Sequence, residues 1–279
     1  MAPIKSSLAK SAKQLLGFFN TADLGLRGAT QITRHVVPPF EASGGNLANG
    51  LEPGNGYKYH TFGTNGDFTV SSGSNTVDIL IVAGGGAGGN NRGGGGGAGG
   101  IVHHSQLSLE PGTYPVVVGD GAAQPGTGSA RGADGTDSSF ASSPSPVYLL
   151  AKGGGGGGCN SAPFEPGNPG GSGGGANYNG NPGPASQGSQ NSPFSGATGF
   201  NQYGNNGGDG SGGPKYNNGG GGGAGGAGGN ATTGSGSDAA GDGGNGQPFP
   251  GFTGPLIGVP ALNPLSGVYG GGGGASVGS

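Results

Sequence analysis

The sequence predicts an all-β protein with three parts: an N-terminal arm with a short helix, a small antiparallel β-sandwich, and a Gly-rich region of stacked polyglycine II helices and loops. Three observations lead to this prediction. Apolar and polar residues alternate in short segments over residues 57–152, as in strands with one buried face. Glycine supplies 78 of the 279 residues, whereas a share of about 7% is usual. Apolar residues at helical spacing occur near the N-terminus.

Residues 1–50 are predicted to form the arm. The apolar stripe that predicts its short helix consists of Leu8, Ala12, Leu15, Leu16 and Phe19. Because a single short helix is marginal on its own, this stripe needs a surface to pack on. That surface belongs either to another protein, which would make the arm a docking segment, or to the rest of this chain. A basic helix lying on a membrane surface is a third interpretation. The remainder of the arm, up to residue 50, has the pattern of an extended loop.

The sandwich is predicted from segments with strand-like patterns, which are 57–62, 67–70, 77–84, 99–109, 113–121, 138–143 and 146–153. A Gly-Thr-Asn-Gly turn separates the first two and favours a hairpin. The side chains expected to form the core are Phe62, Phe68, Val70, Ile79, Ile81, Leu107, Val116, Val118, Phe140 and Leu149. A single core of this size suits a small antiparallel sandwich.

The glycines that follow the apolar segment 77–82 raise the question of a nucleotide site. Gly84, Gly86 and Gly89 have the spacing of the dinucleotide-binding fingerprint. That fingerprint requires a helix directly after the glycines. Residues 87–100 are mostly glycine, and each interior glycine destabilises a helix by about 1 kcal/mol relative to alanine. We therefore expect no dinucleotide site, and the lack of a Gly-Lys-Ser/Thr motif excludes a P-loop.

Residues 153–248 are dominated by Gly, Asn, Ser and Pro. One interpretation is a flexible linker. Collagen requires glycine at every third residue, and this period is not kept. Polyglycine II consists of extended threefold helices that lie close together and share their backbone hydrogen bonds. It fits separate glycine runs, such as 153–158 and 219–223, that are interrupted by turn residues. Apolar residues return in 249–279, which we expect to cap this region.

Composition and residue patterns exclude several classes of function. The net charge is −3 and the basic residues are scattered, so we expect no nucleic-acid partner. Neither paired carboxylates nor the sequence context of a nucleophile triad is apparent, so we predict that the protein is not an enzyme. Asp120, Asp134 and Asp137 lie outside any EF-hand pattern, and the adjacent His103 and His104 point to opposite faces of a strand. We therefore predict no metal site and no cofactor.

Aromatic residues in the Asn/Gly/Ser-rich loops are the candidates for binding. Tyrosine gives rigid amphipathic contact area, and Asn and Ser give adaptable hydrogen bonds, as in antibody contact loops. The candidates for receptor binding are Tyr178, Phe194, Phe200, Tyr203 and Tyr216. The alternative is that each aromatic ring packs over the glycine segments as the available hydrophobic group, and both roles are compatible.

A family resemblance joins these observations. The segments HTFGTNGDFTV, VDILIVAGGGAGG, GGGGAGGIV, LEPGTYPVVVGDG and GTDSSF together resemble the glycine-rich domain of bacteriophage virion proteins, over about residues 57–158. In composition, the Gly-rich zone is similar to the adhesin tips of long tail fibres in T-even-like phages. Those tips stack polyglycine II helices and display loops that bind host receptors.

This resemblance implies a virion protein of the tail-fibre or appendage type that acts in host recognition. It further implies that the arm docks on other virion proteins, that the loops bind a host surface glycan or outer-membrane protein, and that the chain forms a homo-oligomer, a trimer by analogy with other phage fibres. The alternatives are a capsid decoration or head-fibre protein and a polysaccharide-degrading enzyme, which the lack of carboxylate pairs disfavours.

Overall fold

The computed structural model describes residues 38–126, 128–142, 144–161, 166–178, 199–212, 216–233, 239–259 and 266–276, and the backbone of residues 2–7. Over these residues the chain is all-β apart from one short 3-10 helix. The elements in chain order are β1 (Ala2–Ser7), β2 (Glu41–Ser43), β3 (Ala48–Leu51), β4 (Tyr57–Phe62), β5 (Gly66–Ser72), β6 (Asn75–Val82), β7 (Ile101–Leu109), β8 (Gly112–Val117), β9 (Ser138–Phe140), β10 (Leu149–Ala151), β11 (Phe200–Tyr203), β12 (Ser211–Gly212), β13 (Tyr216–Asn217), β14 (Gln247–Pro248), η2 (Pro250–Phe252) and β15 (Val268–Tyr269).

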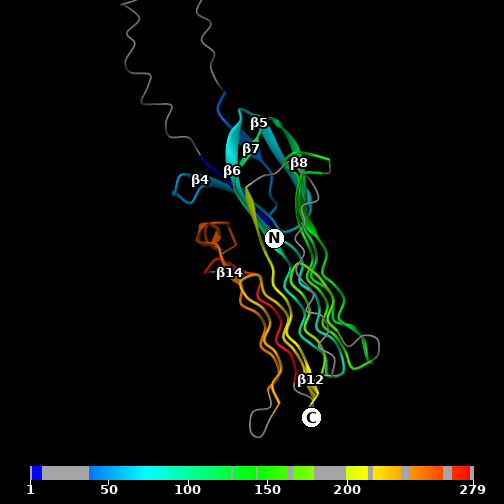
Figure 1. The fold of residues 1–279 in the computed structure, drawn as a ribbon. Helices are drawn as coiled ribbons and strands as arrows, with labels where there is room; N and C mark the ends of the chain where they lie inside the picture. The colour runs from blue at the N-terminus through cyan, green and yellow to red at the C-terminus, as the bar shows by residue number, and fades with distance from the viewer. Residues whose placement is uncertain are drawn as a thin grey trace, which may run out of the picture.

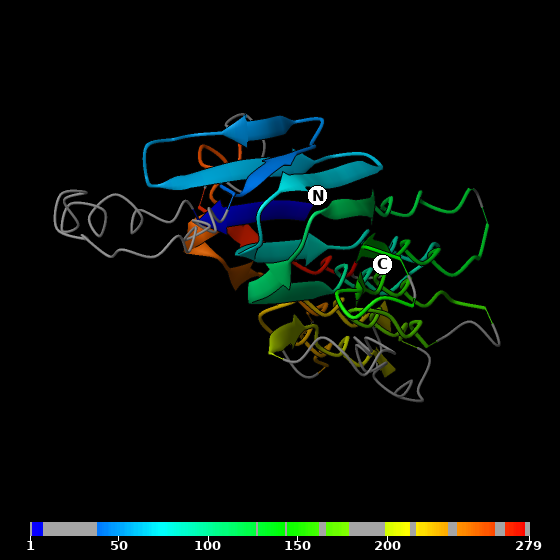
Figure 2. The same ribbon diagram turned by 90° about the horizontal axis from the view of Figure 1, so that it is seen from above.

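The larger strands form the predicted antiparallel sandwich (Figures 1 and 2). One sheet has six strands in the order β11-β7-β6-β1-β4-β3, and the other has five in the order β10-β9-β8-β5-β2. Neighbouring strands in both sheets run antiparallel. Each segment that we expected to be a strand overlaps one of the strands β4 to β10, so the sequence pattern is confirmed there.

The core between the sheets is built from the side chains that the alternation predicts. All ten expected residues belong to it; nine are buried, and Val118 packs against them as a partly buried neighbour. Phe140 lies near the centre, where the ring of Tyr114 stacks on it and the ring of Phe68 tilts toward it. Full burial of each large apolar side chain contributes about 1.5–3 kcal/mol, so these residues hold the two sheets together.

The N-terminal residues differ from the predicted arm, because they form a strand of the sandwich. Residues 2–7 form β1, which lies between β4 and β6 in the six-stranded sheet (dark blue in Figure 2), with Ile4 opposite both His60 and Ile79. β2 and β3 add strands where we expected an extended loop. The local pattern does not reveal these strands because their pairing partners are distant in the chain. The stripe that predicts the helix, Leu8 to Phe19, lies outside the described residues.

Gly-rich segments continue the strands of the sandwich as extended rods that run side by side away from it (Figure 1). β6 leads into one such segment, a turn at Asn91 and Arg92 reverses the chain, and a second segment leads into β7. We call these segments glycine rods; they comprise residues 83–90, 93–100, 118–124, 130–137, 152–160, 166–177, 204–210, 217–224, 225–231, 239–246 and 270–276. The rods therefore begin well before residue 153, where we had placed the start of the Gly-rich region.

Hydrogen bonds between the rods repeat every three residues. Along rod 93–100, the N–H groups of residues 94, 97 and 100 donate to rod 152–160, and those of residues 95 and 98 donate to rod 217–224. The partner residues run in the reverse order in the first case and in the same order in the second, so both antiparallel and parallel pairs occur. A β-strand, by contrast, has a period of two. Every third residue faces the same neighbour, which lets one rod bond to several others.

Glycine is needed within this bundle because the rods touch backbone to backbone. A Cβ added to Gly94 would lie 2.1 Å from the carbonyl oxygen of Gly175, and one added to Gly97 would lie 2.2 Å from that of Ser172. Atoms cannot approach so closely without moving one of the rods. The rods satisfy one another's N–H and C=O groups, so backbone contact takes the place of a side-chain core.

The C-terminal segment covers the outer face of the six-stranded sheet. Phe249, Phe252 and Ile257 pack there with Tyr59 and Leu80 of the sheet in a second apolar cluster. The Tyr59 hydroxyl donates to the carbonyl of residue 251 at 3.1 Å, and burial raises the pKa of this hydroxyl. Residues 249–259 thus lie on the sandwich, while residues 270–276 return to the bundle as a rod.

Candidate functional site

Two of the five aromatic candidates belong to the sandwich. Phe200 and Tyr203 lie in β11, the edge strand that pairs with β7. Phe200 packs against the core between the sheets, and Tyr203 packs against the cluster on the outer face. The ring of Tyr203 stands 5.3 Å from that of Phe249, at nearly a right angle. These contacts explain both residues by packing, which is the alternative that the sequence left open.

Two other candidates, Tyr178 and Tyr216, meet at the end of the rods away from the sandwich, beside β12 in Figure 1. Their ring centroids are 4.2 Å apart. The Tyr178 hydroxyl donates to the side-chain oxygen of Asn160 at 3.0 Å, and the Tyr178 N–H donates to the side-chain oxygen of Asn218. The fifth candidate, Phe194, lies outside the described residues.

Arg92 joins this pair of tyrosines. Its guanidinium carbon lies 3.9 Å from the centroid of the Tyr216 ring, a distance suited to a cation–π interaction. We call Arg92, Asn160, Tyr178 and Tyr216 the distal cluster; all four are partly exposed. Arg92 is not among the residues predicted from the sequence, where its signal is the Asn-Asn-Arg interruption between two glycine runs.

The backbone at this turn is unusual for Arg92. Asn91 and Arg92 have positive φ values of 50° and 59°, a region that glycine enters freely and Asn enters often, whereas a residue such as Arg enters it at a cost of roughly 1–2 kcal/mol. Most of the described residues with a positive φ are glycines, yet residue 92 has a long charged side chain. Strained backbone of this kind concentrates at functional sites, which points to a use for the Arg92 side chain.

The distal cluster has the chemistry of a contact surface. Tyrosine rings offer flat apolar faces at a small cost in conformational entropy. The guanidinium and the amides offer hydrogen-bond donors with fixed direction. The rods hold these groups rigidly because the backbones on which they stand are hydrogen-bonded to one another, for example Asn160 N–H to the carbonyl of Asn91 at 3.3 Å. The cluster is therefore suited to binding.

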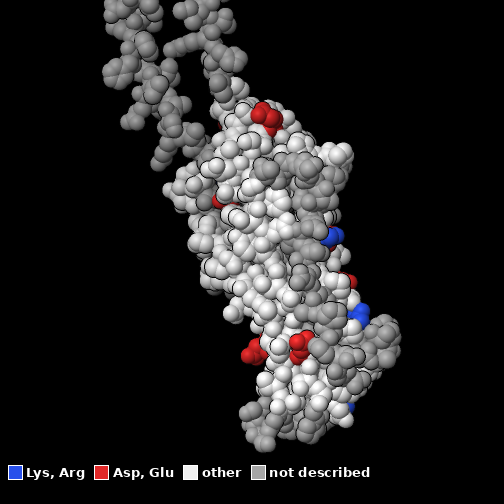
Figure 3. All heavy atoms as spheres, viewed as in Figure 1, with Lys and Arg blue, Asp and Glu red and all other residues white. Residues whose placement is uncertain are grey.

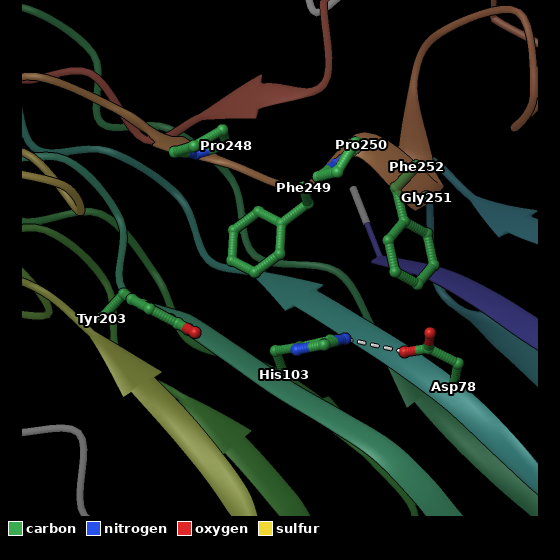
Figure 4. A pocket seen from close by; sticks show the side chains of 8 residues that line it. All are labelled: Asp78, His103, Tyr203, Pro248, Phe249, Pro250, Gly251 and Phe252. Atoms are coloured by element: carbon green, nitrogen blue, oxygen red, sulfur yellow. Dashed lines mark hydrogen bonds and ion pairs between the residues drawn. The ribbon is translucent and has the colours of Figure 1, made fainter.

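A pocket of about 360 Å³ lies between the six-stranded sheet and residues 248–252 (Figure 4). Nε2 of His103 lies 2.7 Å from a carboxylate oxygen of Asp78 on its floor. The rings of Phe249 and Phe252 stand edge-on to the imidazole at 5.4 and 6.0 Å. The eight lining residues include neither Ser nor Cys. The hydrogen bond thus joins neighbouring strands β6 and β7, and the His103 ring contacts the C-terminal segment through Phe249 and Phe252.

The side chains of two aspartates accept hydrogen bonds from backbone N–H groups of a glycine rod. A carboxylate oxygen of Asp137 accepts the N–H of Gly153, and one of Asp134 accepts that of Gly156, each at 2.8 Å. Their three-residue spacing matches the period of rod 152–160, so the side chains of rod 130–137 supply acceptors beside the backbone hydrogen bonds that join the same two rods. In the described part of the chain, no three His, Cys, Asp or Glu side chains gather in a way that suits a metal ion.

Two features of the whole described structure bear on the kind of partner it could bind. Charged side chains are few and scattered on the face shown in Figure 3. Within the described ranges, no helix has the length and hydrophobicity needed to cross a bilayer.

The fold and the distal cluster define an all-β protein in which backbone-packed glycine rods extend a β-sandwich. A family model described as a glycine-rich domain matches residues 60–279. The chain therefore belongs to the glycine-rich domain family. The match reaches to the end of the chain, beyond the segment 57–158 on which we based the resemblance. No curated protein and no solved structure gave a match to it.

Proposed function

We propose that this chain is a structural protein of a phage virion, of the tail-fibre or appendage type, and that its distal cluster contacts the host surface. The observation that carries the proposal is the position of that cluster. Tyr178, Tyr216 and Arg92 come from separate segments of the chain, and they meet at the end of the bundle opposite the sandwich (Figure 1). An appendage needs its binding groups at such a free end.

We further propose that the glycine rods are polyglycine II helices. Their three-residue hydrogen-bond period and their mixture of parallel and antiparallel neighbours support this assignment. A bundle of this kind is stiff, because each rod is bonded along its length to several others. A stiff bundle loses less conformational entropy when the residues at its tip bind a partner.

We propose two kinds of partner for this chain. The apolar stripe Leu8, Ala12, Leu15, Leu16 and Phe19 docks on another virion protein, and the distal cluster binds a host glycan or outer-membrane protein. The protein is located in the virion and acts by binding, without catalysis or a cofactor.

Binding of the labelled full-length chain to a panel of bacterial strains, measured by flow cytometry, tests the proposal. We expect saturable binding to at least one strain. Tyr178→Ala and Tyr216→Ala should each weaken it more than about tenfold, as expected for aromatic residues at the centre of a contact surface. The matched control is Tyr148→Ala, because Tyr148 is a partly buried tyrosine of the sandwich, just before β10.

The control variant should bind like the unchanged chain. If no strain binds the folded protein, or if the two tip variants bind as well as the control, the distal cluster is a brace between rods and the proposed recognition function is wrong.

A further inference from the structure

Two rods of the glycine bundle differ in how their backbone N–H groups are used. Rod 152–160 is buried among other rods, and the N–H groups of Gly153 and Gly156 donate to the side chains of Asp137 and Asp134. Among the described residues, no side chain accepts an N–H group of rod 270–276 in this way. Its backbone hydrogen bonds run to rods 93–100, 217–224 and 239–246, and the rest of its backbone makes none within the described part of the chain.

The free side follows from the three-residue period. The N–H groups of Gly272 and Ala275 donate to rod 239–246, and that of Gly273 donates to the carbonyl of Gly96. The residues between them in the period are Gly271 and Gly274. Both are exposed, and neither N–H has a backbone partner within the described part of the chain.

Glycine at these two positions has no internal explanation. A Cβ on Gly271 would meet no atom within 4 Å, and one on Gly274 would meet its nearest atom at 3.9 Å. Neither residue has the positive φ that favours glycine. An exposed glycine in extended backbone is destabilising by roughly 0.5–1 kcal/mol relative to alanine, and Ala275 shows that this rod accepts a methyl group. At most glycines inside the bundle, such as Gly94 and Gly97, bare backbone coincides with the close approach of another rod.

We propose that the free side of rod 270–276 is an interaction surface for a second copy of this chain, paired through the same rod. A partner for this surface needs exposed backbone N–H and C=O groups that repeat every three residues. The same rod of a second copy has these groups. Residues 266–276 carry no charge, so two copies do not repel each other there. Rods in the bundle pair in parallel and antiparallel directions, so two-fold and three-fold arrangements both allow the contact. Unpaired backbone edges are the usual template for such pairing.

Sedimentation of the full-length chain tests this surface. The unchanged protein should have a mass that is a multiple of the 26.0 kDa chain. The double variant Gly271→Leu/Gly274→Leu should sediment as a single chain with an unchanged melting temperature, because its new side chains block the approach of another rod while a Cβ at either position makes no contact closer than 3.9 Å within the molecule. Gly126→Leu is the control, since Gly126 is exposed and has open space around it.

Cross-linking provides a second readout that does not depend on bulky side chains. Gly274→Cys should form a disulfide between copies on oxidation, whereas Gly126→Cys should not; the natural Cys159 is buried and should stay unreactive. A single-chain mass for the unchanged protein at all concentrations, an undiminished mass for the double variant, or equal cross-linking of the two cysteine variants would overturn the proposal.

Discussion

Gly86 lies against Gly155 so closely that a Cβ added to Gly86 would stand 2.3 Å from the Gly155 carbonyl oxygen. The neighbouring Gly85 differs, because a Cβ there would meet its nearest atom at 3.7 Å, an ordinary contact distance. The two residues lie in the same glycine run and neither has a positive φ. They therefore separate the effect of backbone packing from that of glycine composition.

Gly86→Ala should destabilise the protein by about 1–3 kcal/mol, because the methyl group must push rod 152–160 away. Gly85→Ala should leave stability unchanged or raise it slightly, since alanine reduces the entropy of the unfolded chain. Urea unfolding of the two variants and the unchanged chain measures both effects. Equal stability of the two variants would mean that the rods do not pack as described.

Arg92→Gly should separate the two possible roles of Arg92. Glycine relieves the positive-φ backbone but removes the cation–π contact with Tyr216, which is worth about 0.5–1 kcal/mol at an exposed site. The two effects nearly cancel, so the melting temperature should change little. Binding to the responsive strain should fall severalfold. A large loss of melting temperature would instead identify Arg92 as a structural brace.

His60 should make stability depend on pH. Burial lowers its pKa below the ordinary 6.5, although the hydrogen bond from Nδ1 to the carbonyl of Gly44 opposes that effect. The unfolded chain therefore binds a proton more readily than the folded chain. The stabilisation is complete above the unfolded pKa and is lost as the pH falls below it toward the folded pKa.

Urea unfolding at about pH 7.5 and about pH 5.0, on either side of the ordinary histidine pKa, measures this dependence. The free energy of unfolding should fall more for the unchanged chain than for His60→Gln, which retains a hydrogen-bond donor and does not titrate. The same loss in both proteins would show that His60 is not responsible.

The sequence predicts the sandwich well because apolar and polar residues alternate within each strand and so show which of its side chains are buried. Phe62, Phe68 and Ile79 stand at alternating positions that one sheet face requires, and the core is made of them. β1 could not be predicted in this way, since its place between β4 and β6 depends on pairing over long distances in the chain. Polar and charged residues in its short segment give no alternation to read.

The distal cluster could be predicted only in part. Tyr178 and Tyr216 stood out as aromatic residues among Asn and Gly, but so did Tyr203, which packs on the sheet. What separates these tyrosines is the rod or strand to which each belongs. Glycine has no side chain, so a glycine segment has no pattern from which its neighbours could be predicted. Arg92 interrupts two glycine runs in the sequence, but its contact with the Tyr216 ring depends on which rods lie side by side, and the sequence does not show this.

Amide hydrogen exchange followed by NMR shows whether the glycine segments are ordered rods bonded to one another. The N–H of Gly97 donates to the carbonyl of Gly155 at 2.8 Å, whereas Gly54 and Gly126 are exposed and have no atom near their Cβ positions. If the rods are ordered, the Gly97 amide exchanges at least about a hundredfold more slowly than those of Gly54 and Gly126, as buried, hydrogen-bonded amides do. Equally fast exchange at all three glycines would show that the segments are flexible linkers and that the rods described above do not form.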